Sequence, residues 1–171
     1  DQPTALFQAV ERALGEVVGH KLFTVLAADM ENRLNLRLYS SMPDSYAVGG
    51  SKPMRPDSWG DMPVAERHPY IGHTKEDIRK RFFDHALIES LDLGSVINLP
   101  VSFDGVFLGT VNLLHEEGYY DADDAATAAH YAKSEDGPYG YYFSNLMKKL
   151  SRGPKFRVFS AYPDQPENEI T

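Results

Sequence analysis

The residues best suited to chemistry in this chain are polar side chains set within apolar stretches. Asn98, Thr110, Asn112 and His115 interrupt two apolar runs that are typical of strands. A polar group that is buried needs a hydrogen-bond partner. The sequence therefore leaves two interpretations open: backbone groups and water satisfy these side chains, or some of them line a cavity and orient a ligand.

Aromatic side chains and one histidine from the preceding loop and helices are candidates for covering such a cavity. They are Tyr39, Tyr46, Trp59, Phe82, Phe83 and His85. Aromatic walls with a few convergent polar groups are typical of small-molecule sites, although each ring taken alone is more often plain core. Lys52 and Arg55 in the same loop would attract an anionic ligand, unless they are simply solvated.

The chain lacks the residues that several kinds of catalytic and metal site require. The chain has no cysteine, which removes thiol nucleophiles, thiolate metal sites and disulfides. It has no Gly-x-Ser-x-Gly turn, and Gly49–Lys52 is followed by Pro53 where a phosphate loop needs a helix. His68 and His73 lie in a loop, and the acids of Asp121–Asp124 lack the glycine and final glutamate of a calcium loop. We expect no metal, no other cofactor and no catalytic residue.

Composition indicates one ordinary globular domain with an extension. The chain has 171 residues, 42% hydrophobic and 25% charged, with a formal net charge of −8. Such a charge makes nucleic acid an unexpected partner. No apolar run reaches the roughly 18 residues of a membrane span, and no signal peptide is recognisable. These features predict a cytoplasmic protein without membrane association.

Hydrophobic spacing predicts a helix, two strands and a long irregular region in the first half of the chain. The helix covers 3–18, with Thr4 as N-cap and Gly19 as terminator. Strands are expected at 21–28 and 33–39, joined by a turn at 29–32. Strict alternation in the second strand places Leu34, Leu36 and Leu38 on one face, opposite Asn35, Arg37 and Tyr39.

The middle of the chain is predicted as a loop at 40–57, a short helix within 58–67 and an edge strand at 69–72. A longer helix follows from Lys75 to about Leu91. Thr74 and Asp77 form a capping box at its start.

The strongest local signal is the pair of strands 95–103 and 106–115 around Asp104-Gly105, the preferred type I′ turn. A regular two-residue hairpin pairs Val101 with Leu108 and Leu99 with Thr110. Both faces are apolar enough to be buried. This register places Asn98 on the face opposite Thr110 and Asn112.

Asp121 is expected to cap a helix from Ala122 to about Lys133. Beyond it, a helix at 139–150, a strand at 156–162 and a polar end that frays are predicted.

The hairpin from Ser95 to His115, followed by Tyr119-Tyr120-Asp121 and a helix, resembles GAF domains, with PAS domains as the nearest competitor. The resemblance covers about residues 4–133. It implies an α+β fold, an α/β sandwich whose six-stranded antiparallel sheet carries helices on one face and a pocket covered by loops and helices on the other. The methionine-sulfoxide-reducing and bilin-binding members need cysteines that are absent here, and the Asn-Lys-Phe-Asp-Glu signature of cyclic-nucleotide binders is missing.

The resulting hypothesis is a GAF-like domain at 1–133 with a helix–strand extension and tail at 134–171. We expect a signalling-related small-molecule sensor of the non-catalytic, bacterial kind. It would form a homodimer through its first helix and its tyrosine-rich C-terminal segment, since tyrosine is enriched at interfaces. The alternatives are a metabolite enzyme using His85 or His115 as general base and a structural dimerisation module without a ligand.

Overall fold

The computed structural model describes residues 3–133, which form one six-stranded antiparallel sheet with strand order β3-β2-β1-β6-β5-β4. The strands are β1 (Leu22–Asp29), β2 (Leu34–Ser40), β3 (Ser51–Pro53), β4 (Tyr70–Gly72), β5 (Ser95–Phe103) and β6 (Val106–His115). The helices are α1 (Thr4–Val17), α2 (Lys75–Arg81), α3 (His85–Ser90) and α4 (Ala122–Lys133), with 3-10 turns η1 (Trp59–Asp61) and η2 (Val64–Glu66). The α+β fold with a six-stranded antiparallel sheet is as the sequence predicted.

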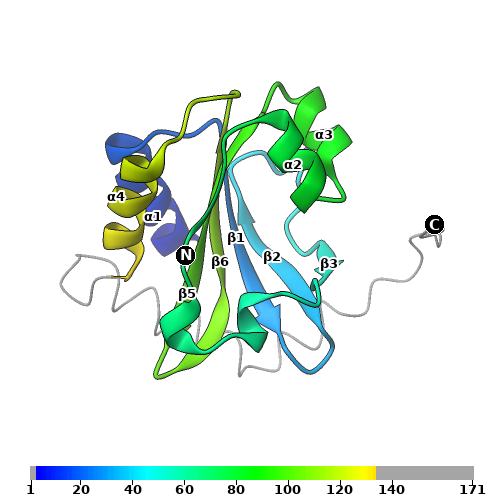
Figure 1. Ribbon diagram of the computed structural model, residues 1–171, viewed down its shortest axis with the longest axis vertical. Coiled ribbons are helices and arrows are strands. Elements are labelled where there is room, and N and C mark those ends of the chain that lie inside the picture. The colour runs from blue at the N-terminus through cyan, green and yellow to red at the C-terminus, as the bar shows by residue number, and fades with distance from the viewer. Residues whose placement is uncertain (1–2, 134–171) are drawn as a thin grey trace.

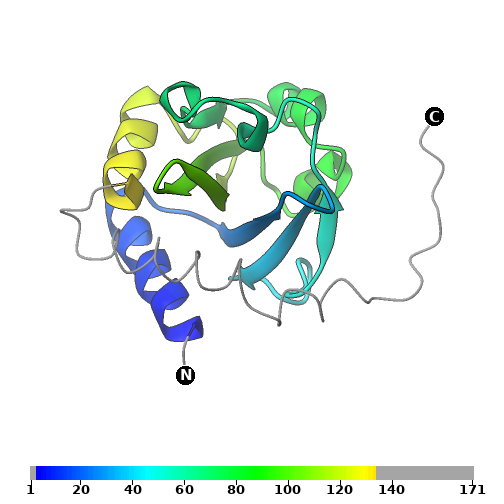
Figure 2. The same cartoon turned by 90° about the horizontal axis from the view of Figure 1, so that it is seen from below.

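The two faces of the sheet are covered by different parts of the chain. Helices α1 and α4 lie together on one face, while α2, α3 and the segments around η1 and η2 lie toward the other (Figures 1 and 2). The main core lies under α1 and α4, where Phe7, Val10 and Leu14 pack against β1, β5 and β6. We call this the helix face of the sheet, and the other the loop face.

Helix α1 ends as predicted but begins differently. Gly19 adopts a positive φ of 75° and its N–H donates to the carbonyl of Leu14, which closes the last turn. At the start, Pro3 is the N-cap and makes no side-chain cap bond, while Thr4 is the first helical residue. The prediction of Thr4 as N-cap was wrong because the carbonyl of Pro3 already accepts the N–H groups of Leu6 and Phe7.

The middle of the chain contains more breaks than its pattern predicted. Ser51–Pro53 pairs with β2 as an edge strand, within a region predicted as loop. The helix expected from Lys75 to Leu91 is two helices, because Phe82 is extended with φ −117° and ψ 123°. The Thr74–Asp77 capping box is confirmed, and the bidentate bond between Arg79 and Glu89 joins α2 to α3.

A bulge in β2 changes the face on which its last residues lie. Val25 pairs with Tyr39 and Leu26 with Arg37, so Leu38 has no cross-strand partner. Alternation is therefore interrupted, and Tyr39 does not share the face of Arg37. Tyr39 packs on the helix face against Phe7 and Phe23.

A second bulge, at Leu108 in β6, shifts the register of the β5–β6 hairpin from the one that the sequence predicted. The Asp104-Gly105 turn has the two positive φ values, 51° and 75°, that a type I′ turn requires, and Phe103 pairs with Val106 as predicted. Beyond Ser102 the pairing shifts by one, so that Val101 faces Gly109 and Leu99 faces Val111. A one-residue shift exchanges the faces of a strand. Asn98, predicted on the face opposite Thr110 and Asn112, therefore shares their face.

Asp121 caps α4 as predicted, accepting the N–H groups of Asp123 and Asp124. The helix, strand and tail predicted within 134–171 lie outside the described residues.

Candidate functional site

A row of three polar side chains crosses the middle of the loop face. Asn112 on β6 pairs directly with Thr24 on β1 and with Asn98 on β5. The Nδ2 of Asn98 donates to the Oδ1 of Asn112 at 2.5 Å, and the Nδ2 of Asn112 donates to the Oγ1 of Thr24 at 3.1 Å. All three are buried. We call them the polar row.

Apolar clusters lie on both sides of the polar row, along the direction of the strands. Toward α2 and α3, Leu22, Val96 and Leu114 pack with Ile78 and Ile88. Toward η1, Ala28, Met54 and Phe107 pack with Trp59. The polar row therefore separates two cores instead of merging with either, which is the arrangement expected at the base of a binding site.

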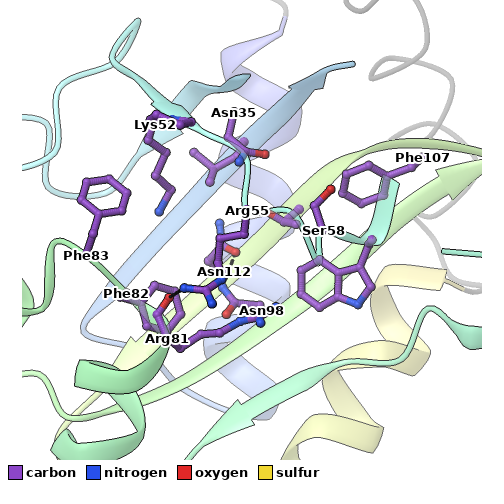
Figure 3. A pocket seen from close by; sticks show the side chains of 14 residues that line it. Asn35, Lys52, Arg55, Ser58, Arg81, Phe82, Phe83, Asn98, Phe107 and Asn112 are labelled. Atoms are coloured by element: carbon purple, nitrogen blue, oxygen red, sulfur yellow. Dashed lines mark hydrogen bonds between the residues drawn. The ribbon is translucent and has the colours of Figure 1, made fainter. Parts of the chain in front are cut away.

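A partly open cavity of about 100 Å³ lies over this part of the sheet, and a second space of about 30 Å³ adjoins it. The larger one is lined by Leu26, Asn35, Lys52, Pro53, Arg55, Ser58, Trp59, Arg81, Phe82, Phe83, Asn98, Phe107, Thr110 and Asn112. Figure 3 shows Lys52 reaching in from the side of Asn35 and Phe83 toward Asn112 and Asn98. Five residues line both spaces: Leu26, Lys52, Phe82, Asn98 and Asn112.

Lys52 brings a cation into the cavity without a compensating hydrogen bond. Its Nζ lies 5.7 Å from the ring centroid of Phe82 and 5.8 Å from that of Phe83, a cation–π arrangement. Among the described residues it forms no ion pair or hydrogen bond. Burial lowers the pKa of Lys52 below 10.5, and the nearby Asp84 carboxylate opposes that shift.

The two arginines of the cavity share one carboxylate. The carboxylate of Asp57 accepts a hydrogen bond from Nε of Arg55 at 3.0 Å and one from Nη1 of Arg81 at 2.6 Å. Burial opposes ionisation of Asp57, but the two arginine hydrogen bonds outweigh it and hold its pKa below 3.8. Asp57 itself is not among the lining residues. The single carboxylate of Asp57 thus offsets one of the two guanidinium charges.

The smaller space contains two buried polar atoms without partners. Arg37 Nε and Asp84 Oδ1 make no hydrogen bond within the described chain. The Arg37 guanidinium lies 4.8 Å from the ring centroid of Tyr46, whose hydroxyl reaches the Oδ2 of Asp84 at 3.5 Å. Burial lowers the pKa of Arg37 and raises that of Tyr46. A donor and an acceptor therefore remain available beside the polar row.

Arg67 holds the segment that covers one end of the cavity. Its Nε donates to the carbonyls of Trp59 and Met62, and its Nη1 donates to Ser102 Oγ and the carbonyl of Gly105. The indole N–H of Trp59 is donated to the carbonyl of His68 at 3.0 Å, which fixes the ring over the cavity edge.

The structure brings together seven of the ten predicted site residues. Trp59, Phe82, Phe83, Asn98, Thr110 and Asn112 line the larger space and Tyr46 lines the smaller one. The bulge in β6 is the reason that both asparagines and the threonine meet there.

Three predicted site residues lie elsewhere. Tyr39 is on the helix face, where its hydroxyl donates to Glu11 and burial raises its pKa to about 12. His85 begins α3 with its ring partly exposed, 3.8 Å from Glu89. His115 stacks on Tyr119 and accepts the N–H of Glu116, and burial lowers its pKa below 6.5. Placing these side chains in the pocket was wrong, because the β2 bulge turns Tyr39 away and both histidines lie at the ends of their elements.

Sequence reasoning missed other lining residues, among them Asn35, Ser58, Arg81 and Phe107. Asn35 had a usable signal, since the alternation along 33–39 places it on the face opposite Leu34, Leu36 and Leu38. Arg81 had none, because helical spacing alone places it on a solvated face.

No group of three or more histidine or acidic side chains within residues 3–133 is arranged to hold a metal ion. Over the same residues, no helix combines the length and the apolar character needed to cross a bilayer.

Comparison with solved structures identifies the fold as that of GAF domains. A domain assigned to a two-component sensor histidine kinase of Sinorhizobium meliloti 1021 superposes with a TM-score of 0.66 at 13% identity, covering 89% of this chain and 98% of that one. The GAF domain/HD domain protein of Geobacter sulfurreducens gives 0.60 at 14% identity, with coverages of 84% and 92%. The second GAF domain of DevS from Mycobacterium smegmatis gives 0.58 at 13% identity, with coverages of 88% and 99%. No protein-family model matches the chain, and no curated protein matches its sequence.

Proposed function

We propose that this GAF-fold chain is a non-catalytic sensor or regulatory domain that binds a small molecule in the cavity over the polar row. The observation that carries the proposal is the cavity itself, in which Asn98, Asn112 and Thr110 line a space bounded by aromatic rings. Burying amides in a sheet costs stability unless they are fully paired. A binding site explains why a sheet with apolar clusters on both sides retains them.

The fold comparison supports a signalling role. Solved structures of the same fold come from sensor histidine kinases of Sinorhizobium meliloti and Bacillus halodurans. In such a role, ligand binding would change how the segments covering the cavity pack, and the change would pass to neighbouring parts of the protein.

The two alternatives have less support. An enzyme using His85 or His115 as general base needs that histidine beside the substrate, and neither lines the cavity. A structural module with a filled core would not keep a space of about 100 Å³. That space is smaller than the roughly 300 Å³ typical of sites for drug-sized ligands, so the proposed ligand is small.

Three further expectations belong to this proposal: a domain boundary near residue 133, a cytoplasmic location and a homodimer. Helix α1 buries Phe7, Val10 and Leu14 against the sheet, which leaves an outer face with Arg12 and Glu16 for a partner. The second predicted dimer segment lies in 134–171, outside the described residues.

Native mass spectrometry of freshly purified full chain, together with a metabolite screen, tests the proposal. Trp59 is the only tryptophan of the chain and lines the cavity, so its emission reports binding directly. We expect a bound small molecule or a hit that shifts Trp59 emission and raises Tm. Thr110→Met fills the base of the cavity and should abolish the shift.

Thr4→Met is the matched control, because Thr4 is exposed at the start of α1 on the opposite face. A chain that carries no ligand, and for which no metabolite changes either readout, would contradict ligand binding. The mass of the complex also reports one or two subunits.

A further inference from the structure

The cavity carries an excess of positive charge in a chain that is acidic overall. The lining of the larger space includes Lys52, Arg55 and Arg81 and no carboxylate, while in the smaller space Asp84 is accompanied by Arg37. The whole chain, by contrast, has a formal charge of −8. Asp57 compensates Arg55 and Arg81 in part. Lys52 is the cation whose three N–H donors have no hydrogen-bond acceptor among the described residues.

The surroundings of Lys52 limit what can bind it. Phe82 and Phe83 flank its ammonium, so an anion must approach from the side of the polar row. There Asn98 has used one amide hydrogen on Asn112, which leaves its Oδ1 and its second hydrogen for a ligand. Thr110 adds a hydroxyl that has no side-chain hydrogen bond within the described chain.

The volume sets the ligand size. An apolar cavity of about 150 Å³ accommodates benzene, which has six non-hydrogen atoms. The spaces here are about 100 Å³ and 30 Å³. A ligand of roughly six non-hydrogen atoms therefore fills them.

We propose that the ligand is a short organic carboxylate bearing one further hydroxyl or oxo oxygen, with its carboxylate on Lys52 and the second oxygen on Asn98 and Thr110. This inference rests on the proposed ligand-binding function and names the ligand class. An ammonium that has no hydrogen-bond acceptor within residues 3–133 matches one carboxylate, whereas a phosphate dianion usually takes an arginine fork or a set of backbone N–H groups. Trp59 and Phe107 bound the apolar part of the ligand.

The test compares matched small molecules on the full chain by Trp59 emission and thermal shift at constant ionic strength. Lactate is the carboxylate probe, lactamide is its uncharged counterpart of the same size, and propionate lacks the hydroxyl. We expect lactate to bind at least tenfold more tightly than lactamide, a factor that corresponds to about 1.4 kcal/mol. Propionate should fall between them.

Substitutions separate the charge of Lys52 from general effects. Lys52→Met should weaken lactate binding at least tenfold and leave lactamide binding almost unchanged. Lys80→Met is the control, since Lys80 is exposed on α2, pairs with Glu76 and does not line the cavity. The comparison of lactate with lactamide on the unaltered chain needs no variant, so a folding defect in Lys52→Met does not prevent the test.

The outcomes distinguish this inference from the proposed function. Equal binding of lactate and lactamide, or lactate binding that survives Lys52→Met, would overturn the carboxylate assignment while ligand binding stands. Inorganic phosphate binding more tightly than lactate would also overturn it. If no probe binds and the metabolite screen is empty as well, the proposed function itself fails.

Discussion

At the residue scale, the site depends on side chains whose polar atoms are placed by direct cross-strand pairing. Asn98, Asn112 and Thr24 occupy one row on three neighbouring strands, so the amide of Asn112 has a partner on each side and that of Asn98 on one side only. Asn98 is the end of the chain of hydrogen bonds, which leaves part of its amide for a ligand. The same side chains in a sheet of different register would be on opposite faces.

Arg67 is the residue whose role is best tested by a conservative change. Its guanidinium donates to four acceptors on three segments, a geometry that a lysine ammonium cannot reproduce. We expect Arg67→Lys to lower the free energy of unfolding by about 2 kcal/mol and to shift Trp59 emission to the red, because the η1 segment is released. Chemical denaturation followed by Trp59 fluorescence measures both.

Arg12→Lys, on the exposed side of α1, is the control and should change stability by less than about 0.5 kcal/mol. A loss of stability without a change in Trp59 emission would show that Arg67 does not hold η1 over the cavity.

At the element scale, the β6 bulge decides which side chains reach the cavity. Gly109 lies in the bulge with φ 147°, and a Cβ added there would lie 2.0 Å from the carbonyl oxygen of Leu26 on β1. Only glycine allows β1 to approach this closely. We expect Gly109→Ala to destabilise the fold by about 3 kcal/mol or more, from backbone strain and overpacking together.

Gly118→Ala is the matched control for Gly109→Ala. Gly118 also has a positive φ, 77°, but a Cβ there meets no atom within 4 Å. Its cost should be near 1 kcal/mol, which is the strain alone. Equal Tm values for the two alanine variants would contradict the close β1–β6 contact.

At the scale of the whole molecule, residues 3–133 contain the main core, the two apolar clusters beside the polar row and the strand pairings of the six-stranded sheet. A chain ending at Lys133 should therefore unfold in one cooperative transition and retain the cavity. Calorimetry and Trp59 fluorescence of the shortened and full chains check this expectation. A shortened chain that is unfolded, or that loses the Trp59 response to a ligand of the full chain, would place the domain boundary beyond residue 133.

The sequence by itself determined the turns and helix ends of this protein, because these depend on interactions between residues close together in the chain. The type I′ turn at Asp104-Gly105, the Thr74–Asp77 capping box, the Asp121 cap and the Gly19 terminator follow from backbone and side-chain geometry within a few residues. The element order was enough to indicate the fold.

Only the tertiary structure decided which face each polar side chain occupies. The bulges at Leu38 and Leu108 shift the pairing of β2 with β1 and of β6 with β5 by one residue. Gly109 marks the second bulge only in general terms, since a glycine within a strand often accompanies one, and nothing within β2 marks the first. The first bulge places Tyr39 on the helix face, outside the site. The second places Asn98 on the same face as Thr110 and Asn112. Lys52 and Arg81 reached the same cavity from distant segments, since three-dimensional packing, not sequence spacing, sets the distance between them.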